Sequence, residues 1–418
     1  MAQLSDDCFA FGGELMRADE ALAILAARVS CVAGIEEAAL RLARGRILAE
    51  DVDAPRDVPP HDNAAVDGYA VAFADLAADG ATRLPVSARV AAGQALPGAA
   101  APGTAVRIFT GAPMPAGTDT VFMQEDARED GGAVLLPPGI RKGANRRRRG
   151  EDIAAGSTIL AAGALLRAQD LGLAASIGRT RLRVRSRLRV AVFSTGDELV
   201  EPGAPTPAGK VFDANRAALV ALLEQFGCEA IDLGIVPDRL DAVRGALERA
   251  SAEADAIVTS GGMSTGEEDH VRAAVGDLGS LHFWRLAIRP GRPVALGQVR
   301  GKAFVGLPGN PVAMMVTCMR FARPVLMAMA GAAPCQPLAF RVPTATGLSK
   351  KRGRREWLRA TIERGPDGTP VARKFPRDGA GILTSLVASH GLLELPEDLT
   401  DVAAGAMVDF IPFCELGA

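Results

Sequence analysis

The segment TSGGMSTGEEDH, residues 259–270, combines two kinds of binding chemistry in one turn. Its glycines allow a ligand to approach the backbone, and the amides with the Ser264 hydroxyl can hold a phosphate at the start of a helix. The three acids that follow, Glu267, Glu268 and Asp269, suit a cation instead. The segment therefore predicts a phosphorylated ligand that arrives with a divalent metal ion. The glycines expected to contact this ligand are Gly261, Gly262 and Gly266.

Two other predicted strands of the same region also end in acidic loops. FSTGDEL presents Glu198, and VPDRL presents Asp238. Taken singly, either acid is typical of a helix N-terminus, which it can cap or whose dipole it can meet. Together with Asp269, the acids at successive strand ends favour a site at one edge of a parallel sheet. Because oxygen ligands without clustered His or Cys favour Mg²⁺ over zinc, these three acids are predicted as metal ligands and as catalytic residues.

Two rigid turns complete this group. WRLAIRPGRP places three arginines around a proline, and a guanidinium can bind a phosphate or another oxyanion through two parallel hydrogen bonds. GLPGNP adds a stiff backbone turn at a strand end. The residues predicted to bind the ligand here are Arg285, Arg289, Arg292, Pro308 and Pro311.

A second group of polar residues lies in the first half of the chain. HDNAAVDGYAV contains Asp67, RIFTGAPMP contains Thr110, and RRRRGEDIAAG contains Asp152. Any one of them is most simply a turn residue with ordinary hydrogen bonds.

Composition excludes several classes of protein. The 418 residues carry a formal net charge of −2, which favours neither nucleic acid nor a membrane surface as partner. The six cysteines form no CxxC pair, which predicts reduced thiols in a cytoplasmic protein rather than a disulfide frame or a zinc site. MAQLSDD does not resemble a secretion signal. The longest apolar run is interrupted by Arg320, Arg323 and Pro324, which indicates a buried helix rather than a membrane span.

The periodicity of apolar residues predicts an α/β protein of several domains. Residues 14–29 have a helical pattern, and 35–52 suggest a helix, a cap at Gly45 and then a strand. Strands and helices alternate from 188 to 331, which requires a parallel sheet covered on both faces. The predicted domains are a mixed bipartite N-terminal domain (1–56 plus 151–187), a β-rich inserted domain (57–150), a doubly wound α/β domain (188–331) and a small C-terminal β-barrel (335–418).

Eight segments occur in an order that resembles the molybdopterin molybdenumtransferases, the family of MoeA and the gephyrin E-domain. They are DNAAVDGYAV, RIFTGAPMPAGTDTVFMQE, RRRRGEDI, VAVFSTGDEL, FDANR, TSGGMSTGEEDH, FWRLAIRPGRP and GLPGNPV. The resemblance covers nearly the whole chain. It implies an enzyme of molybdenum cofactor biosynthesis that inserts molybdate into adenylylated molybdopterin at the dithiolene and releases AMP, assisted by Mg²⁺.

The resemblance also implies an elongated homodimer. In such a dimer the α/β domain of one subunit, of the molybdopterin-binding type, faces the inserted domain of the other. Of the catalytic residues that the resemblance implies, Asp67, Thr110 and Asp152 would come from the inserted domain. Asn215 in FDANR would contact the ligand from the α/β side. The implied partners are the molybdopterin adenylyltransferase, which supplies the substrate, and the chaperones of downstream molybdoenzymes.

The family usually has lysines where this chain has the three arginines of WRLAIRPGRP. If these residues only anchor phosphate, arginine should serve, but beside molybdate a wide guanidinium would alter activity or anion choice. In the predicted mechanism, Mg²⁺ and the arginines offset the charge on the phosphates, and a molybdate oxygen or a water attacks phosphorus. No general base is assigned, since several acids qualify. Asp269→Asn should bind the ligand but lose most AMP release.

Two other functions fit the same segments. The chain could be a molybdopterin adenylyltransferase, which would consume ATP without preformed adenylylated pterin. It could also be a non-catalytic scaffold or carrier of molybdopterin. Tungstate is nearly isosteric with molybdate, and the sequence does not choose between these two anions.

Overall fold

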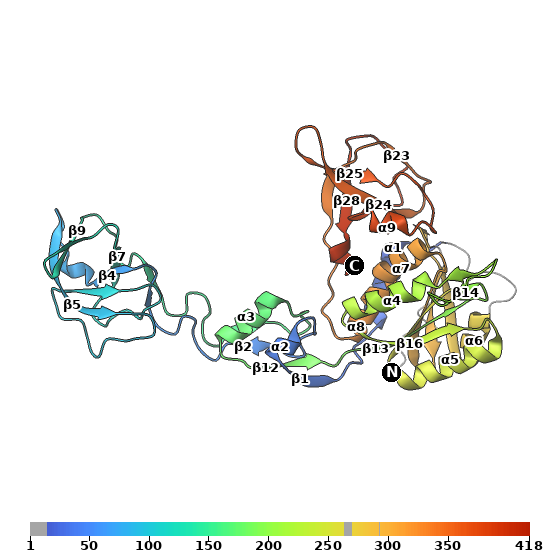
Figure 1. The fold of residues 1–418 in the computed structure, drawn as a ribbon, viewed down its shortest axis with the longest axis horizontal. Coiled ribbons are helices and arrows are strands. Elements are labelled where there is room, and N and C mark those ends of the chain that lie inside the picture. Colours follow the sequence, from blue (N-terminus) through green and yellow to red (C-terminus); the bar gives the residue numbers. More distant parts are fainter. Residues whose placement is uncertain (1–14, 263–269, 292) are drawn as a thin grey trace.

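The computed structural model describes residues 15–262, 270–291 and 293–418, and for 282–285 and 293 it describes the backbone alone. The chain is a multidomain α/β protein with an elongated shape (Figure 1). The β-rich part that contains β4, β5, β7 and β9 lies at one end. The α/β part that contains α4, α5 and α6 lies at the other, beneath the C-terminal strands.

The central sheet has the doubly wound arrangement that the strand–helix alternation predicts. Its order is β16 (Glu229–Val236), β13 (Arg189–Thr195), β17 (Ala256–Ser260), β21 (Lys302–Leu307), β20 (Pro293–Val299) and β18 (Gly279–Arg285). The first four strands are parallel, whereas β20 runs antiparallel to both of its neighbours. The carboxyl ends of β13, β16, β17 and β21 therefore meet at one edge of the sheet.

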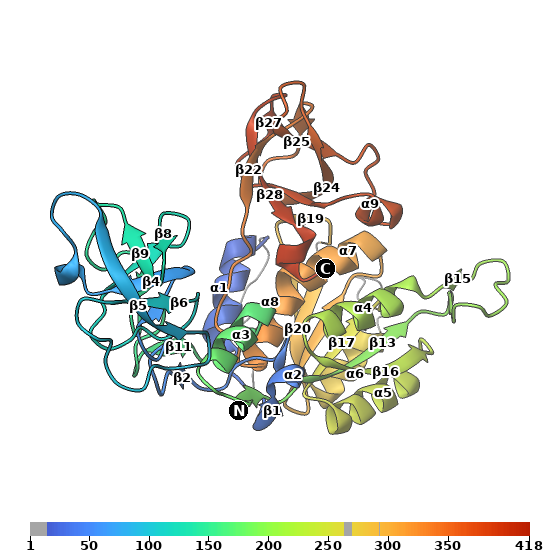
Figure 2. The ribbon, with the colours of Figure 1, turned by 60° about the vertical axis from the view of Figure 1, so that its left-hand side comes forward.

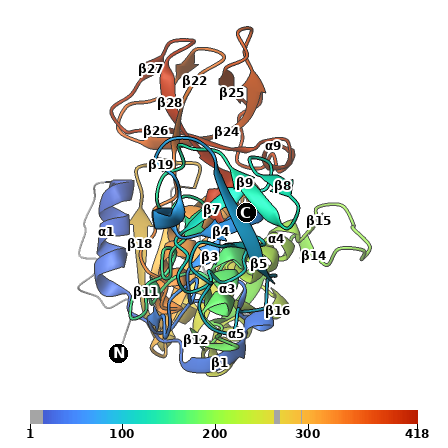
Figure 3. The ribbon, with the colours of Figure 1, turned by 90° about the vertical axis from the view of Figure 1, so that its left-hand side faces the viewer.

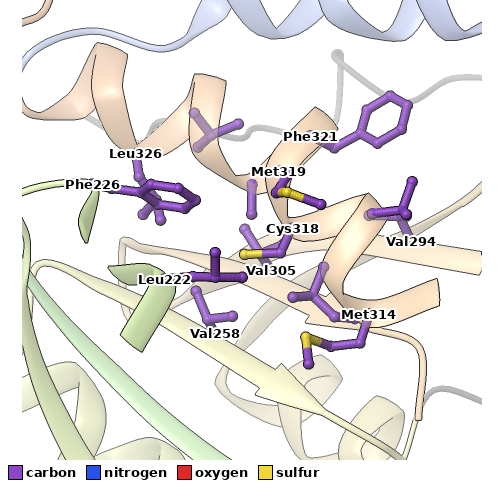
Figure 4. Close-up of a cluster of buried hydrophobic side chains, with 14 of the residues drawn as sticks. Leu222, Phe226, Val258, Val294, Val305, Met314, Cys318, Met319, Phe321 and Leu326 are labelled. Atoms are coloured by element: carbon purple, nitrogen blue, oxygen red, sulfur yellow. The ribbon is translucent and has the colours of Figure 1, made fainter. Parts of the chain in front are cut away.

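Helices cover both faces of this sheet. One face packs against α4 (Ala214–Gln225), α7 (Pro311–Thr317), the π-helical turn η3 (Cys318–Ala322), α8 (Arg323–Met329) and α1 (Ala18–Arg28). The other packs against α5 (Leu240–Glu253) and α6 (His270–Leu278). Figure 4 shows the first of these cores, where Met314, Cys318 and Met319 lie near Val258 and Val305.

Among the described residues, one helical run, Pro311–Met329, is long and apolar enough by length and composition to cross a membrane. The protein buries 67% of it. The run is the core helix of the central sheet, as the interrupting charges at 320 and 323 predict.

The β-rich part contains a second sheet, with the order β7 (Thr120–Met123), β4 (Gly68–Val71), β6 (Ala105–Ile108), β5 (Thr82–Val90), β9 (Ala133–Leu136) and β8 (Arg128–Asp130). Two small apolar clusters stabilise it. A short pair, β3 (Asn63–Ala64) with β10 (Arg146–Arg147), joins the two chain segments that enter and leave this part. The short 3-10 helix η2 (Phe73–Asp75) follows β4.

Between the two ends of the molecule lie paired strands from both flanks of the β-rich part. β1 (Ile35–Ala39) pairs with β12 (Arg181–Arg185), and β2 (Val52–Asp53) pairs with β11 (Thr158–Leu160). With α2 (Leu40–Ala43) and α3 (Ala168–Ser176) they surround a common apolar core. The helix predicted from residue 35 forms only over Leu40–Ala43, because the segment begins as the strand β1. Gly45 follows the helix with a positive φ of 73°, as predicted for a cap. The boundaries of the four predicted domains stay a prediction.

The C-terminal strands form a small barrel above α7, as Figures 2 and 3 show. Its sheet runs β24 (Arg355–Arg364), β26 (Gly391–Leu395), β28 (Met407–Pro412) and β22 (Phe340–Pro343), and β25 (Pro370–Lys374) pairs with the last five residues of β24. A bridge between Thr344 and Ala372 brings the two outer strands together. The remaining short elements are β23 (Leu348–Ser349), α9 (Thr384–Val387), β27 (Asp401–Val402) and η4 (Phe413–Leu416).

One strand connects the barrel with the central domain. β19 (Ile288–Arg289) follows β18 directly along the chain but pairs with β24 of the barrel. Figures 2 and 3 place it between the two bodies. The single strand expected for LHFWRLAI is therefore divided between two sheets, and Arg289 faces the barrel.

Candidate functional site

Acids gather at the carboxyl edge of the central sheet, as the sequence predicts. Thr195, the last residue of β13, donates a hydrogen bond to Asp238 after β16 (3.5 Å). The amide of Asp238 donates to the Asp197 carboxylate (3.4 Å). Glu198 folds back over Gly196, where a Cβ atom would lie only 2.6 Å from its carboxylate. Asp238 and Glu198 therefore belong to neighbouring loops that contact each other through Asp197.

The loop after β13 is held in place by an ion pair with helix α4. It continues into the short parallel strands β14 (Leu199–Val200) and β15 (Val211–Phe212). Arg216 on α4 pairs with Glu201 at the base of this loop, and also with Asp213 and with Asp232 of β16. Asp213 caps α4 by accepting from the Arg216 amide (3.0 Å). This cluster was not predicted, although an N-cap Asp before a helix is a recognisable signal.

Asn215 links the ends of two strands, β17 and β21. Its side-chain Nδ2 donates to the Ser260 hydroxyl at the end of β17 (2.8 Å) and to the Gly309 carbonyl after β21 (2.7 Å). Ser260 in turn donates to the Pro308 carbonyl (3.4 Å). Asn215 Oδ1 is buried and has no hydrogen-bond partner in the described part of the chain. The predicted contact of Asn215 with a ligand stays a prediction, because its amide nitrogen is engaged by the protein.

The glycine segment begins as a close backbone contact. Gly261 and Gly262 have positive φ values of 89° and 64°. A Cβ at Gly261 would lie 2.5 Å from the Thr195 carbonyl, and one at Gly262 would lie 2.5 Å from Val271. Only glycine fits both positions, which brings this loop against the end of β13. Three predicted residues of the segment, Ser264, Gly266 and Asp269, lie outside the described residues.

The two proline-fixed turns lie on different sides of the site. Pro311 is the first residue of α7, and Asn310 is its N-cap. Arg289 turns toward the barrel and pairs with the buried Glu356 (3.4 Å). No described contact joins Arg289 to the acids of the sheet edge. The side chain of Arg285 is not described, and Arg292 lies outside the described residues.

A pocket of about 190 Å³ lies beside Arg289, between the central domain and the barrel. Arg359 of β24 lines it and is only 6% exposed, so burial lowers the pKa of this guanidinium. Arg359 donates to Ser385 (2.9 Å) and to the Gly379 carbonyl (3.2 Å), and its Nη1 has no partner among the described residues. A pocket lined by a buried arginine and a second arginine, Arg289, suits an oxyanion. Sequence reasoning missed Arg359, because one arginine in an apolar strand carries no local signal.

The second predicted group lies on the β-rich arm. The Thr110 amide (2.8 Å) and hydroxyl (2.7 Å) both donate to the same oxygen of Asp67. These hydrogen bonds, the amide first, hold the pKa of Asp67 below its ordinary value. Asp152 is exposed in the loop after β10, whose Arg149 amide donates to Asp62 (2.8 Å). In Figure 1 this arm lies far from the carboxyl edge of the central sheet in the same chain.

The described residues form no cluster of three or more His, Cys, Asp or Glu that could hold a metal ion. Two of the three predicted ligands, Glu198 and Asp238, lie on neighbouring loops, and the third, Asp269, is not described. The donors at this edge are carboxylates, hydroxyls and carbonyls, which match the oxygen ligands of Mg²⁺. The donor types match magnesium, and the predicted magnesium site stays a prediction.

Family models match three consecutive regions of the chain. Residues 16–178 match the MoeA N-terminal region (domain I and II), 191–328 match a probable molybdopterin binding domain, and 341–413 match the MoeA C-terminal region (domain IV).

Characterised relatives cover the chain almost completely. It is 36% identical to the molybdopterin molybdenumtransferase of Haemophilus influenzae over 90% of this chain and 93% of that protein. It is 38% identical to molybdopterin molybdenumtransferase 2 of Mycobacterium tuberculosis, over 88% and 93% respectively. The solved moeA protein of Pyrococcus horikoshii superposes with a TM-score of 0.82 and 30% identity, over 96% of this chain and 100% of that one. The chain belongs to the molybdopterin molybdenumtransferase family.

Proposed function

We propose that this chain inserts molybdate into adenylylated molybdopterin at the dithiolene and releases AMP. Membership of the family makes it a transferase of molybdenum cofactor biosynthesis. The observation that carries the finer proposal is the edge of the central sheet, where carboxylate loops and a tight glycine turn meet. A pocket with two arginines opens between this domain and the barrel. The proposal places the reaction in the cytoplasm, after the molybdopterin adenylyltransferase and before the chaperones of molybdoenzymes.

Different residues of the chain would bind the metal ion, the phosphates and the oxyanion. Glu198, Asp238 and Asp269 would hold Mg²⁺, which when bound offsets negative charge on the phosphates. The backbone of Gly261 and Gly262, with Ser264 and Gly266, would approach the phosphates, and Asn215 would hold the neighbouring strand ends. Arg289 and Arg359 would bind the tetrahedral oxyanion, with Arg285 and Arg292 nearby. The rigid turn with Pro308 and Pro311 would hold the glycine loop and the start of α7 in fixed positions relative to each other.

We also propose that the site is completed by a second copy of the chain. Asp67, Thr110 and Asp152 lie on an arm that points away from the chain's own sheet edge (Figure 1). In a dimer with two-fold symmetry, each arm can reach the sheet edge of the other subunit. The hydrogen bonds from Thr110 keep Asp67 ionised and oriented, so that it can accept a hydrogen bond from the bound ligand.

The reaction is tested with purified protein, adenylylated molybdopterin, Mg²⁺ and either molybdate or tungstate, while AMP release is followed. AMP release that requires both the oxyanion and Mg²⁺, and that EDTA abolishes, supports the proposal. Consumption of ATP in the absence of adenylylated pterin would identify an adenylyltransferase instead. Ligand binding without nucleotide release under any of these conditions would identify a carrier. The two anions compared at equal concentration show which one is preferred.

The shared site is tested by mixing two inactive variants. Asp67→Asn disables the arm, and Glu198→Gln disables the sheet edge. After dissociation and random reassociation, half of the dimers pair one variant with the other, and one of their two sites is intact. The mixture should therefore recover roughly a quarter of wild-type activity, as the symmetry of a dimer dictates. No recovery, with mixed dimers demonstrated by differently tagged chains, would refute the shared site.

A further inference from the structure

Two adjoining cavities share one carboxylate. The smaller cavity, of about 190 Å³, contains Arg359 and the turn at Pro290 and Gly291. The larger, of about 320 Å³, extends into the barrel. Their common wall consists of Arg289, Leu358 and Asp378. Asp378 lies in the exposed loop after β25, and it is the acid of this wall.

The charges around this wall are unevenly paired. Arg289 is partly neutralised by Glu356, which is 1% exposed and also contacts Arg354. Arg359 forms no ion pair within the described chain. Asp378 is bound by Lys374 at 2.7 Å, and about half of its side chain (47%) is exposed. Arg359 therefore has no carboxylate paired with it in the described chain. Asp378 is the negatively charged residue that lines the same pocket.

The pKa of Asp378 is consistent with this proximity. Burial raises it, but the hydrogen bond from Lys374 and the charges of Lys374, Arg289 and Arg359 outweigh burial and hold it below the ordinary value. In return, the charge of Asp378 raises the pKa of Arg359 against the larger, lowering effect of burial. The carboxylate is therefore ionised at neutral pH, and it lines the same pocket as both arginines.

We propose that Asp378 determines the affinity and selectivity of this pocket for oxyanions. Its carboxylate lines the same pocket as Arg289 and Arg359, and the ion pair with Lys374 holds it at the wall, which leaves the guanidinium groups open to an entering oxyanion. The inference rests on the proposed function, because it assigns the oxyanion to this pocket. Asp378 lies outside all the segments from which the sequence predicted site residues.

A carboxylate at the wall has a selective effect, because it can only accept hydrogen bonds. It repels a fully deprotonated dianion such as molybdate, tungstate or sulfate. It can accept a hydrogen bond from phosphate that still carries a proton. Asp378 therefore weakens the binding of the dianions more than that of hydrogen phosphate. Replacement of Asp378 by an uncharged residue should therefore strengthen the binding of the dianions more than the binding of hydrogen phosphate.

The test is a double-mutant cycle on the full-length protein. Binding of molybdate, sulfate and phosphate is measured by calorimetry for wild type, Asp378→Asn, Lys374→Gln and the double variant. Asp378→Asn should bind molybdate and sulfate roughly three- to tenfold more tightly, a range set by Coulomb interaction near a solvated surface. Phosphate should change less. Lys374→Gln should weaken molybdate binding, since the released carboxylate then competes for the arginines, and the double variant should regain it.

Controls separate this inference from the proposed function. Asp409→Asn removes a half-buried carboxylate elsewhere in the barrel and should leave all affinities unchanged. Arg359→Lys, checked for folding by calorimetry, should weaken molybdate binding if the pocket binds the oxyanion. Failure of wild type to bind molybdate, or binding that Arg359→Lys does not alter, counts against the proposed pocket. Binding that depends on Arg359 but is unchanged or weakened in Asp378→Asn overturns only the role of Asp378.

Discussion

Asn215→Asp is the substitution with the most specific expected effect. The new side chain has nearly the same shape, but it replaces the two donors of Nδ2 with an acceptor. That atom lies 2.8 Å from the Ser260 hydroxyl and 2.7 Å from the Gly309 carbonyl. Ser260 can rotate and donate, whereas the carbonyl cannot. An oxygen would therefore face another oxygen at hydrogen-bond distance.

The magnitude follows from the groups involved. Loss of two hydrogen bonds costs about 1 kcal/mol each, and a buried acceptor left without a donor costs roughly a further 1–3 kcal/mol. Since Ser260 can recover one bond, we expect a local destabilisation of roughly 2–4 kcal/mol. It should be confined to the strand ends that Asn215 links, with the rest of the core intact.

The effect should also depend on pH. The facing carbonyl disfavours the charged form, so the pKa of the new Asp in the folded state lies above its unfolded value of about 3.9. The folded state then binds more protons than the unfolded state, and stability falls as pH rises. The variant should differ little from wild type below about pH 4 and most at pH 8.

Hydrogen exchange measured at pH 5 and pH 8 tests this prediction. Peptides that cover the start of α4 and residues 306–311 should exchange faster in the variant after correction for the intrinsic rate, and more so at pH 8. Gln225→Glu, which makes the same change in charge at the exposed end of the same helix, should show no such effect. Equal protection of these peptides in wild type and Asn215→Asp at pH 8 would refute the reasoning.

Three further outcomes follow from the geometry. Gly262→Ala should lower stability by roughly 2 kcal/mol or more, because φ is positive and the added methyl would meet side-chain atoms at 2.5 and 2.7 Å. Gly245→Ala, in a helix with open space around it, should be neutral or stabilising in the same thermal melts. Arg355→Met should cost roughly 3 kcal/mol in denaturant unfolding, since it removes a buried guanidinium that pairs with Asp19, Glu394 and Glu397, and an unchanged midpoint would contradict this. Burial raises the pKa of both Cys228 and Cys318 to about 12, so a thiol reagent should label them slowly in the native protein while it labels the exposed cysteines rapidly. The exposed cysteines among the described residues are Cys31, Cys335 and Cys414.

The central domain could be predicted from local pattern. Where apolar strands alternate with amphipathic helices, the strands are parallel and the sheet is covered on both faces. β20, which has no helix between it and the strands before and after it, runs antiparallel. Since the loops after parallel strands meet at one edge, the neighbouring positions of Asp238 and the loop of Glu198 followed from their places after β16 and β13. The need for glycine at 261 and 262 could likewise be read from the segment itself.

Features that depend on distant parts of the chain could not be predicted. Ile35–Ala39 has a helical composition, but it pairs as a strand with residues 181–185, and the pairing outweighs the local preference. Arg289 lies in a segment that suggests anion binding, yet the switch of β19 into the barrel sheet places it against Glu356. Arg359 and Asp378 join it only because the barrel packs on the central domain.

The sequence by itself determined the order of the elements, the edge of the sheet where the acids gather, and the family. Tertiary structure decided which charges face each other, and it placed Asp67 and Thr110 on an arm remote from the sheet edge of their own chain. The physical reason is the range of the forces involved. Periodicity and turn preferences act over a few residues, whereas ion pairs and pockets depend on contacts between segments that lie tens to hundreds of residues apart.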